Sequence, residues 1–220
     1  MVPPSPPAVV RHLRVDERAL RTATGARFVF LARNRERIIR ALAFDTDEAE
    51  AIVKLRPVER DDIDARRDIE RLTSSNPPQV GGVTHGRALD ARRLLSHYRS
   101  AQRRFGIRWE LLAAINYVET DFGRARTTAR ADAQGPMQFE AATWRAYGMG
   151  GDVYDADDAI LGAANLLAAN GGRTDERAAL RHYNLSPLYW DAVLHLAHRM
   201  ATVRSAYREY YAWNLYLRKR

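Results

Sequence analysis

The stretch WELLAAINYVETDFGR, residues 109–124, largely decides how this sequence is interpreted. Leu112, Ile115 and Glu119 are spaced i, i+3 and i+7, so they lie along one face of a predicted helix. Glu119 thus occupies a position where an apolar residue is expected. Burying an ionised carboxylate is costly unless it is paired or its pKa rises, and a raised pKa suits a general acid. The pattern alone also fits a glutamate at a frayed helix end that reaches solvent or pairs with Arg124.

A second stretch, AQGPMQFEAATW at residues 133–144, joins a Gly-Pro turn to a predicted helix. Gly135 and Pro136 would let the backbone approach a ligand closely. Gln138 carries both a donor and acceptors, which suit the amide and hydroxyl groups of a ligand. By itself, this stretch reads as an ordinary loop before a helix.

Apolar periodicity predicts helices along most of the chain. After residue 87 they are expected at 88–104, 107–119, 140–147, 157–169, 175–183 and 187–203. Periodicity disappears between Thr127 and Phe139, which indicates a loop or a short hairpin. The aromatic residues between Tyr207 and Arg220 are expected to pack onto the domain.

The first third of the chain is predicted to be a small antiparallel helical unit. An apolar stripe runs from Phe28 to Phe44, and a second helix begins at Asp45, with Glu48 completing a capping box. A third helix is expected from about Val58 to Leu72. We therefore divide the chain into four parts: a helical N-terminal segment at 1–72, a linker at 73–87, a catalytic domain at 88–203 and an aromatic tail at 204–220. The first segment holds no candidate catalytic residue, so it is expected to be dispensable for chemistry.

Four strings together resemble the SLT-type lytic transglycosylases, whose fold is lysozyme-like: LLAAINYVETDFGR, AQGPMQFEAATW, LGAANLLAANGG and ALRHYNLSP. They follow the order and spacing of that family over roughly residues 90–203. The similarity is strongest to secreted members from high-GC Gram-positive bacteria. The resemblance implies a mainly α protein with a lysozyme-like catalytic domain and a helical N-terminal appendage.

The resemblance also implies roles for individual residues. Glu119 matches the catalytic glutamate of the family. Tyr183 and Asn184 match a Tyr-Asn pair whose tyrosine points toward that glutamate, although LSP follows here where many members have a glycine. The residues expected to bind substrate are Thr120, Gly135, Met137, Gln138, Phe139, Tyr183 and Asn184.

Most glycosidases use two carboxylates, whereas this family uses one. The resemblance implies that Glu119 protonates the bond between N-acetylmuramic acid and N-acetylglucosamine. The substrate's acetamido group would then stabilise the cation, and Glu119 would accept a proton from the muramyl 6-hydroxyl to close a 1,6-anhydro ring. Asp121 should point to the opposite side of the helix, while Asp132 or Glu140 could approach the cleft.

Two alternatives follow from the same residues. The first is a hydrolytic muramidase on the same fold, such as a lysozyme or phage lysin, with water activated by Asp132 or another acid. The second is a catalytically silent domain that only binds cell-wall glycan. The silent domain is disfavoured because the chain has Glu119, Gln138 and Tyr183 together.

Composition limits the partners and cofactors. The chain has no cysteine and a net charge of +8, and its basic residues are almost all arginine, distributed along the chain among Asp and Glu. We interpret this as a solvated charged surface, without a nucleic-acid motif. No apolar run approaches the ~18 residues that a membrane span needs. The expected partner is peptidoglycan, acted on by a monomer without metal or cofactor.

Two clusters could suggest metal ligands, and in both cases a structural role is favoured. His195 and His198 lie one turn apart on the last predicted helix, and we interpret them as surface or packing residues. The acidic residues between Asp152 and Asp158 lack the spacing of an EF-hand and are expected to cap the following helix. Because peptidoglycan lies outside the cytoplasm, we expect an extracellular or cell-wall location, with a signal peptide already removed from this sequence.

Overall fold

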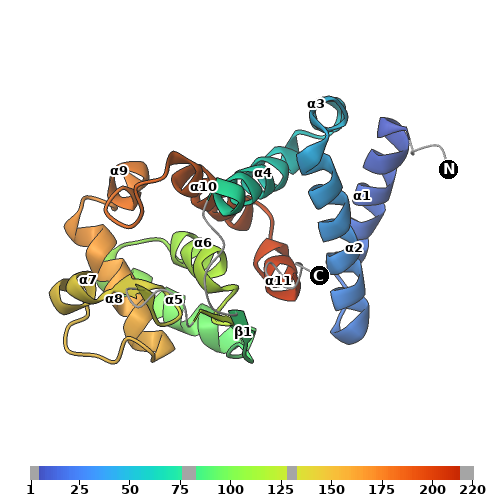
Figure 1. Cartoon of the computed structure of the whole chain (residues 1–220). Coiled ribbons are helices and arrows are strands. Elements are labelled where there is room, and N and C mark those ends of the chain that lie inside the picture. Colours follow the sequence, from blue (N-terminus) through green and yellow to red (C-terminus); the bar gives the residue numbers. More distant parts are fainter. Residues whose placement is uncertain (1–4, 76–82, 128–132, 214–220) are drawn as a thin grey trace.

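The computed structural model describes residues 5–75, 83–127 and 133–213, and Figure 1 shows that helices make up most of it. The mainly α prediction is confirmed, and the architecture agrees with a lysozyme-like class. The first part of the chain forms α1 (Pro6–Leu20), α2 (Gly25–Phe44), α3 (Thr46–Leu55), the short 3-10 helix η1 (Pro57–Glu59) and α4 (Arg60–Ser75). The second part forms α5 (Ala91–Phe105), α6 (Trp109–Thr120), α7 (Ala141–Tyr147), α8 (Ala156–Ala169), α9 (Glu176–Leu180), α10 (Pro187–Thr202) and α11 (Ala206–Ala212).

Two small antiparallel sheets accompany the helices. Strand β1 (Val83–His85) pairs with β2 (Ala125–Thr127), with Val83 opposite Thr127. Strand β3 (Ala133–Gln134) pairs with β4 (Phe139–Glu140), with Gln134 opposite Phe139. The second pair forms a short hairpin, which is one of the two possibilities that the sequence left open before Phe139. The first pair ties the end of the predicted linker to the segment that follows α6.

Capping residues explain several helix boundaries. The Asp45 side chain accepts a hydrogen bond from the Glu48 backbone N–H at 2.9 Å, which confirms the predicted start of α3. The Asp155 side chain accepts from the N–H groups of Asp157 and Asp158, so it caps α8 as expected. Helix α1 was not predicted from the sequence. The prolines at its start occupy the first-turn positions, where a missing N–H costs nothing.

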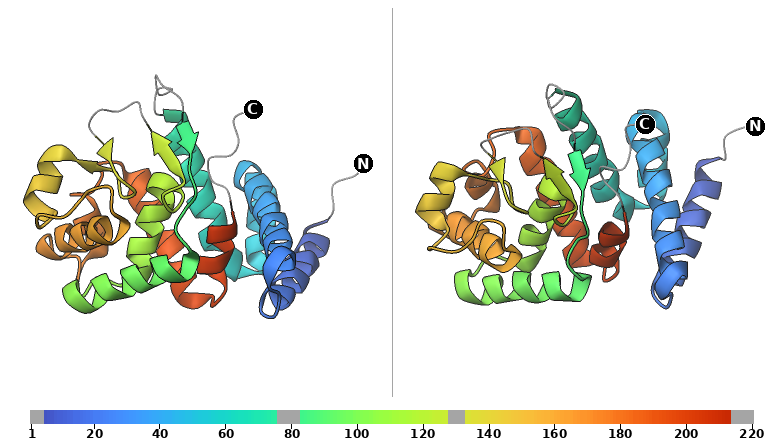
Figure 2. Two further views of the ribbon diagram at one scale, coloured as in Figure 1. Left: turned by 90° about the horizontal axis from the view of Figure 1, so that it is seen from below. Right: turned by 60° about the horizontal axis from the view of Figure 1, so that its bottom comes forward.

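Helix α6 lies at the centre of the second part of the molecule, with α5, α8, α10 and α11 packed around it. Every residue from Leu111 to Val118 is buried, which explains why this stretch reads as apolar on more than one face. Figure 2 shows α5 along one side of this group of helices, and α1 and α2 at the far end of the molecule. Among the described residues, no helix is both long and apolar enough to cross a bilayer.

The N-terminal helices share a core with the second part of the chain. Phe28 of α2 and Ile69 of α4 belong to the same buried cluster as Val193 and Leu196 of α10. Helix α4 also continues to Ser75, beyond the predicted start of the linker. Removing residues 1–72 would therefore uncover one side of this core. The packing favours a role in stability for a segment that holds no candidate catalytic residue.

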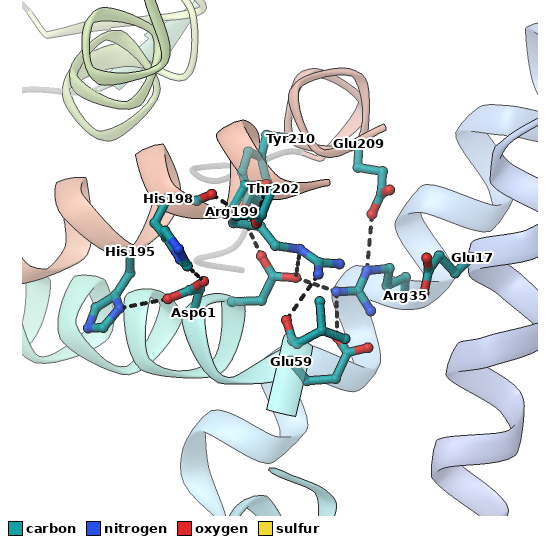
Figure 3. A network of polar contacts seen from close by, with 12 residues as sticks. Glu17, Arg35, Glu59, Asp61, His195, His198, Arg199, Thr202, Glu209 and Tyr210 are labelled. Atoms are coloured by element: carbon teal, nitrogen blue, oxygen red, sulfur yellow. Dashed lines mark hydrogen bonds and ion pairs between the residues drawn. The ribbon is translucent and has the colours of Figure 1, made fainter. Parts of the chain in front are cut away.

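A network of buried charges joins the same two parts of the molecule (Figure 3). The Arg35 guanidinium of α2 binds Glu59 of η1, Asp62 of α4 and Glu209 of α11, the last at 3.0 Å from its Nε. Arg199 of α10 lies 3.1 Å from the Asp62 carboxylate. All five side chains are buried. The opposite charges compensate one another, so the network is stable only while its members stay together.

We predict that Arg35→Ala lowers the free energy of unfolding by about 3–5 kcal/mol, because it leaves three carboxylates without their shared cation. Arg37→Ala provides a matched control, since Arg37 is exposed two residues further along the same helix. Its cost should be within about 0.5 kcal/mol. Urea unfolding of both variants, followed by circular dichroism, measures the difference. Equal losses of stability would contradict the importance of the network.

Candidate active site

Glu119 lies on the last turn of α6 and is half-buried beneath the start of α10. Its Oε1 accepts a hydrogen bond from the Tyr189 hydroxyl at 2.7 Å. Burial raises the pKa of the Glu119 carboxyl to about 7, and the Tyr189 hydrogen bond opposes that rise. The carboxyl is therefore largely protonated below neutral pH and can donate a proton. This is the electrostatic property that the apolar-face position predicts for a general acid.

A sharp reversal of the chain fixes the end of α6. Asp121, Phe122 and Gly123 all adopt left-handed backbone angles, with φ of 51°, 60° and 80°. The Asp121 N–H bonds the Tyr117 carbonyl at 2.9 Å, and the Phe122 ring lies 5.3 Å from the Tyr117 ring. The Asp121 carboxylate pairs with Arg124 at 3.2 Å. These contacts hold the last helical turn, and therefore Glu119, in one place.

The tyrosine that touches Glu119 is not the one predicted from the sequence. The Tyr183 hydroxyl donates to the Met137 carbonyl at 2.6 Å, so it holds the neighbouring loop. Tyr183 nevertheless lies beside the site, because its ring stacks on Tyr189 with centroids 6.2 Å apart. Burial raises the pKa of its hydroxyl, and the nearby Glu119 charge raises it further. The Tyr189 hydroxyl contacts the carboxyl directly, and the predicted role of Tyr183 in the reaction stays a prediction.

Sequence reasoning missed Tyr189, although a usable signal was present. Tyr189 follows Pro187 at the start of α10 and shares a buried stripe with Val193 and Leu196. A tyrosine hydroxyl buried on the apolar face of a helix normally finds a polar partner. A polar group on the apolar face of a helix is also the signal that identified Glu119.

The loop before β4 is anchored to α6 by its backbone. The Pro136 carbonyl accepts hydrogen bonds from the Asn116 side-chain amide at 2.7 Å and from the Thr120 hydroxyl at 2.6 Å. The Tyr98 hydroxyl in turn donates to the Asn116 side-chain oxygen at 2.6 Å. Thr120 was expected to bind substrate. Its side chain is buried and joins the loop to α6, so it is a positioning residue.

Gly135 is needed for a close approach, but the group it approaches is part of the protein. Its φ is +71°, and a Cβ at this position would lie 1.9 Å from the Val153 carbonyl oxygen. The sequence predicted an approach to a ligand. The structure shows a different close approach, because Gly135 lets the loop pack against the segment that precedes α8, and the approach to a ligand stays a prediction.

The next three residues of this loop differ in exposure. Met137 and Phe139 were expected to line the cleft, but both side chains are buried, at 0% and 3% exposure. They secure the loop in the core instead of presenting side chains to a ligand. Gln138 is partly exposed and left-handed, with φ of 51°, and its side-chain amide donates to the Gly135 carbonyl at 2.8 Å. Gln138 is therefore the residue of the three whose side chain can meet a ligand.

Asn184 shapes the turn between α9 and α10. Its side-chain oxygen accepts from the Ser186 N–H at 2.9 Å, and its carbonyl accepts from the Trp190 indole. These bonds close the turn without the glycine that many members of the resembled family have there. Asn184 was expected to bind substrate, which stays a prediction, and its observed contacts hold the turn that leads into α10.

The candidate second carboxylates lie in different surroundings. Asp121 is buried and paired with Arg124, and Glu140 is exposed directly before α7. Asp132 lies outside the described residues. His195 and His198 both contact the Asp61 carboxylate of α4, at 3.1 and 2.6 Å (Figure 3). In the described part of the chain, no group of three or more His, Asp or Glu side chains could hold a metal ion.

Comparison with known proteins gives one relevant similarity. A curated protein named membrane-bound lytic murein transglycosylase F, from Thiobacillus denitrificans, is 34% identical to this chain over 100 residues. The match covers 46% of this chain but 20% of that relative, so the chain spans a small part of the relative's length. No protein-family model and no solved structure matches the chain. The similarity supports a relationship between this chain and the lytic murein transglycosylases.

Proposed function

We propose that this chain cleaves the bond between N-acetylmuramic acid and N-acetylglucosamine in peptidoglycan without water, leaving 1,6-anhydro-muramyl ends. The observation that carries the proposal is the half-buried Glu119 carboxyl with a pKa of about 7, hydrogen-bonded to Tyr189. The name of the similar protein supports murein transglycosylase activity in general. The substrate class, a monomeric state and a site of action outside the cytoplasm are parts of the same proposal.

In the proposed reaction, protonated Glu119 donates its proton to the glycosidic oxygen, and the bond to the muramyl C1 breaks. The acetamido oxygen of the substrate stabilises the resulting cation. Glu119, now a carboxylate, accepts the proton of the muramyl 6-hydroxyl while that oxygen bonds to C1. Tyr189 stabilises the carboxylate form between the two steps, because its hydroxyl donates to Oε1.

A hydrolytic muramidase is the alternative on the same site, and it requires a second carboxylate to activate water. Of the candidates Asp132 and Glu140, Asp132 lies outside the described residues and Glu140 is exposed to solvent, while Asp121 is already paired with Arg124. An intramolecular 6-hydroxyl also has a large effective concentration relative to water. These points favour the transglycosylase. A silent binding domain would not need a costly carboxyl with a raised pKa.

Glu119→Gln should slow the release of glycan fragments from purified sacculi by at least about 100-fold, because the amide keeps the shape but has no acidic proton. Glu140→Gln is the matched control, since it makes the same change at an exposed carboxyl directly before α7. The control should stay within about threefold of the wild type if Glu119 acts alone. Activity of Glu119→Gln within about tenfold of the wild type would remove Glu119 from the reaction.

The products should distinguish the two enzyme hypotheses. Mass spectrometry of the released fragments is expected to show muramyl ends that lack one water and resist borohydride reduction. Mainly reducible ends would instead indicate hydrolysis and would require a second carboxylate in the cleft.

Tyr189→Phe should move the alkaline limb of the pH–rate profile upward by about one pH unit. The Tyr189 hydroxyl favours ionised Glu119, so its removal raises the pKa of Glu119 and keeps the acid protonated to higher pH. Tyr183→Phe is the matched control, because its hydroxyl donates to the Met137 carbonyl and not to Glu119. The alkaline limb of the Tyr183→Phe profile should stay at the pH of the wild type. A profile that shifts equally in both variants would contradict the different roles assigned to the two tyrosines.

A further inference from the structure

The positive charge of the chain is concentrated in its first two helices. Residues 5–44 hold nine arginines and three acidic residues, so they carry six of the eight net positive charges. The sequence suggested that arginines are distributed along the whole chain among acidic residues. Outside residues 5–44, positive and negative charges are indeed nearly equal in number. The structure gives this excess one location, because these residues form the α1–α2 hairpin at the edge of the molecule farthest from α7 and α8 (Figures 1 and 2).

The acidic side chains of the hairpin face inward. Asp16 and Glu36 are buried, and Glu17 pairs with Arg21 and Arg56. Apart from Arg21 and His12, the exposed charged side chains between residues 5 and 44 are Arg11, Arg14, Arg18, Arg27, Arg33 and Arg37. The exposed charged side chains of the hairpin are therefore cations without exposed acids to neutralise them, and one of them, Arg33, also donates from its Nε to the Ala212 carbonyl at 3.3 Å.

Apolar side chains are exposed among these arginines. On α1, Val15 is 58% exposed and lies between Arg11 and Arg18, four residues after one and three residues before the other. On α2, Phe30 is 67% exposed and lies three residues from both Arg27 and Arg33. At these spacings, each apolar side chain shares a helix face with two arginines. Neither packs into the core clusters of the protein.

We propose that the α1–α2 hairpin is a docking surface for a bilayer rich in anionic phospholipid. Arginines near such a surface are attracted by its negative potential, and each contributes to binding. Exposed Phe and Val side chains gain by entering the boundary between headgroups and acyl chains. A polyanionic polymer such as nucleic acid or wall polyphosphate would use the arginines alone. The interleaved apolar residues therefore favour lipid over a polymer.

Vesicle sedimentation tests this proposal without using enzyme activity, so it is independent of the proposed function. The full chain should bind phosphatidylcholine vesicles containing about 30% phosphatidylglycerol, and pure phosphatidylcholine vesicles much more weakly. A variant combining Arg11→Gln, Arg14→Gln and Arg18→Gln should bind at least about tenfold more weakly. The matched control removes the same charge from α5 through Arg92→Gln, Arg93→Gln and Arg103→Gln, all exposed. It should lose less than about threefold.

A second pair of measurements distinguishes a lipid bilayer from a polyanionic polymer as the partner. Phe30→Ser should weaken vesicle binding severalfold but leave binding to long-chain polyphosphate and duplex DNA unchanged, because the substitution does not alter the charge of the protein. Equal losses in the α1 and α5 variants would overturn the location of the surface. Tighter binding to polyphosphate or DNA than to vesicles, unaffected by Phe30→Ser, would overturn the lipid partner. If the α1 variant melts early, Arg27→Gln combined with Arg37→Gln on α2 tests the same surface.

Discussion

The candidate site depends on the placement of one carboxyl, that of Glu119, which is half-buried at the end of a buried helix. This placement costs free energy whenever the group ionises, and the surroundings must supply compensation. Tyr189 supplies part of it through a direct hydrogen bond. The rest of the local architecture serves to hold these two side chains together. The left-handed turn after Thr120 ends α6, and the Asn184 turn sets the start of α10.

The loop beside the carboxyl is positioned by contacts that involve few exposed side chains. Asn116 and Thr120 hold the Pro136 carbonyl, Tyr183 holds the Met137 carbonyl, and Gly135 fits against Val153. The loop is therefore rigidly attached to α6 and α9–α10, which also carry Glu119 and Tyr189. Such preorganisation suits an acid that must meet a glycosidic oxygen in one geometry. The N-terminal helices extend this support, since α4 packs on α10 and the Arg35 network joins α2 to both α4 and α11.

Much of the fold could be predicted from the sequence, because apolar periodicity and capping residues are local signals. Asp45 and Asp155 cap their helices as expected, and Glu119 stood out as a charge on an apolar face. Helix α1 was missed because the first apolar stripe was placed at Phe28, although prolines in a first helical turn are common. The division of labour between Tyr183 and Tyr189 could not be predicted, since it depends on how the start of α10 lies over α6. Thr120, Met137 and Phe139 lie in the expected stretch, but tertiary packing turned their side chains inward.

The acidity of Glu119 is set by the fold, because burial raises the pKa of its carboxyl. It can be measured directly by recording the carboxyl carbon resonances of the ¹³C-glutamate-labelled protein against pH, with Glu119→Gln identifying the resonance of interest. This resonance is expected to titrate with a pKa of about 7, well above the ordinary range of glutamate. A resonance that titrates near about 4.3, like an exposed glutamate, would contradict it.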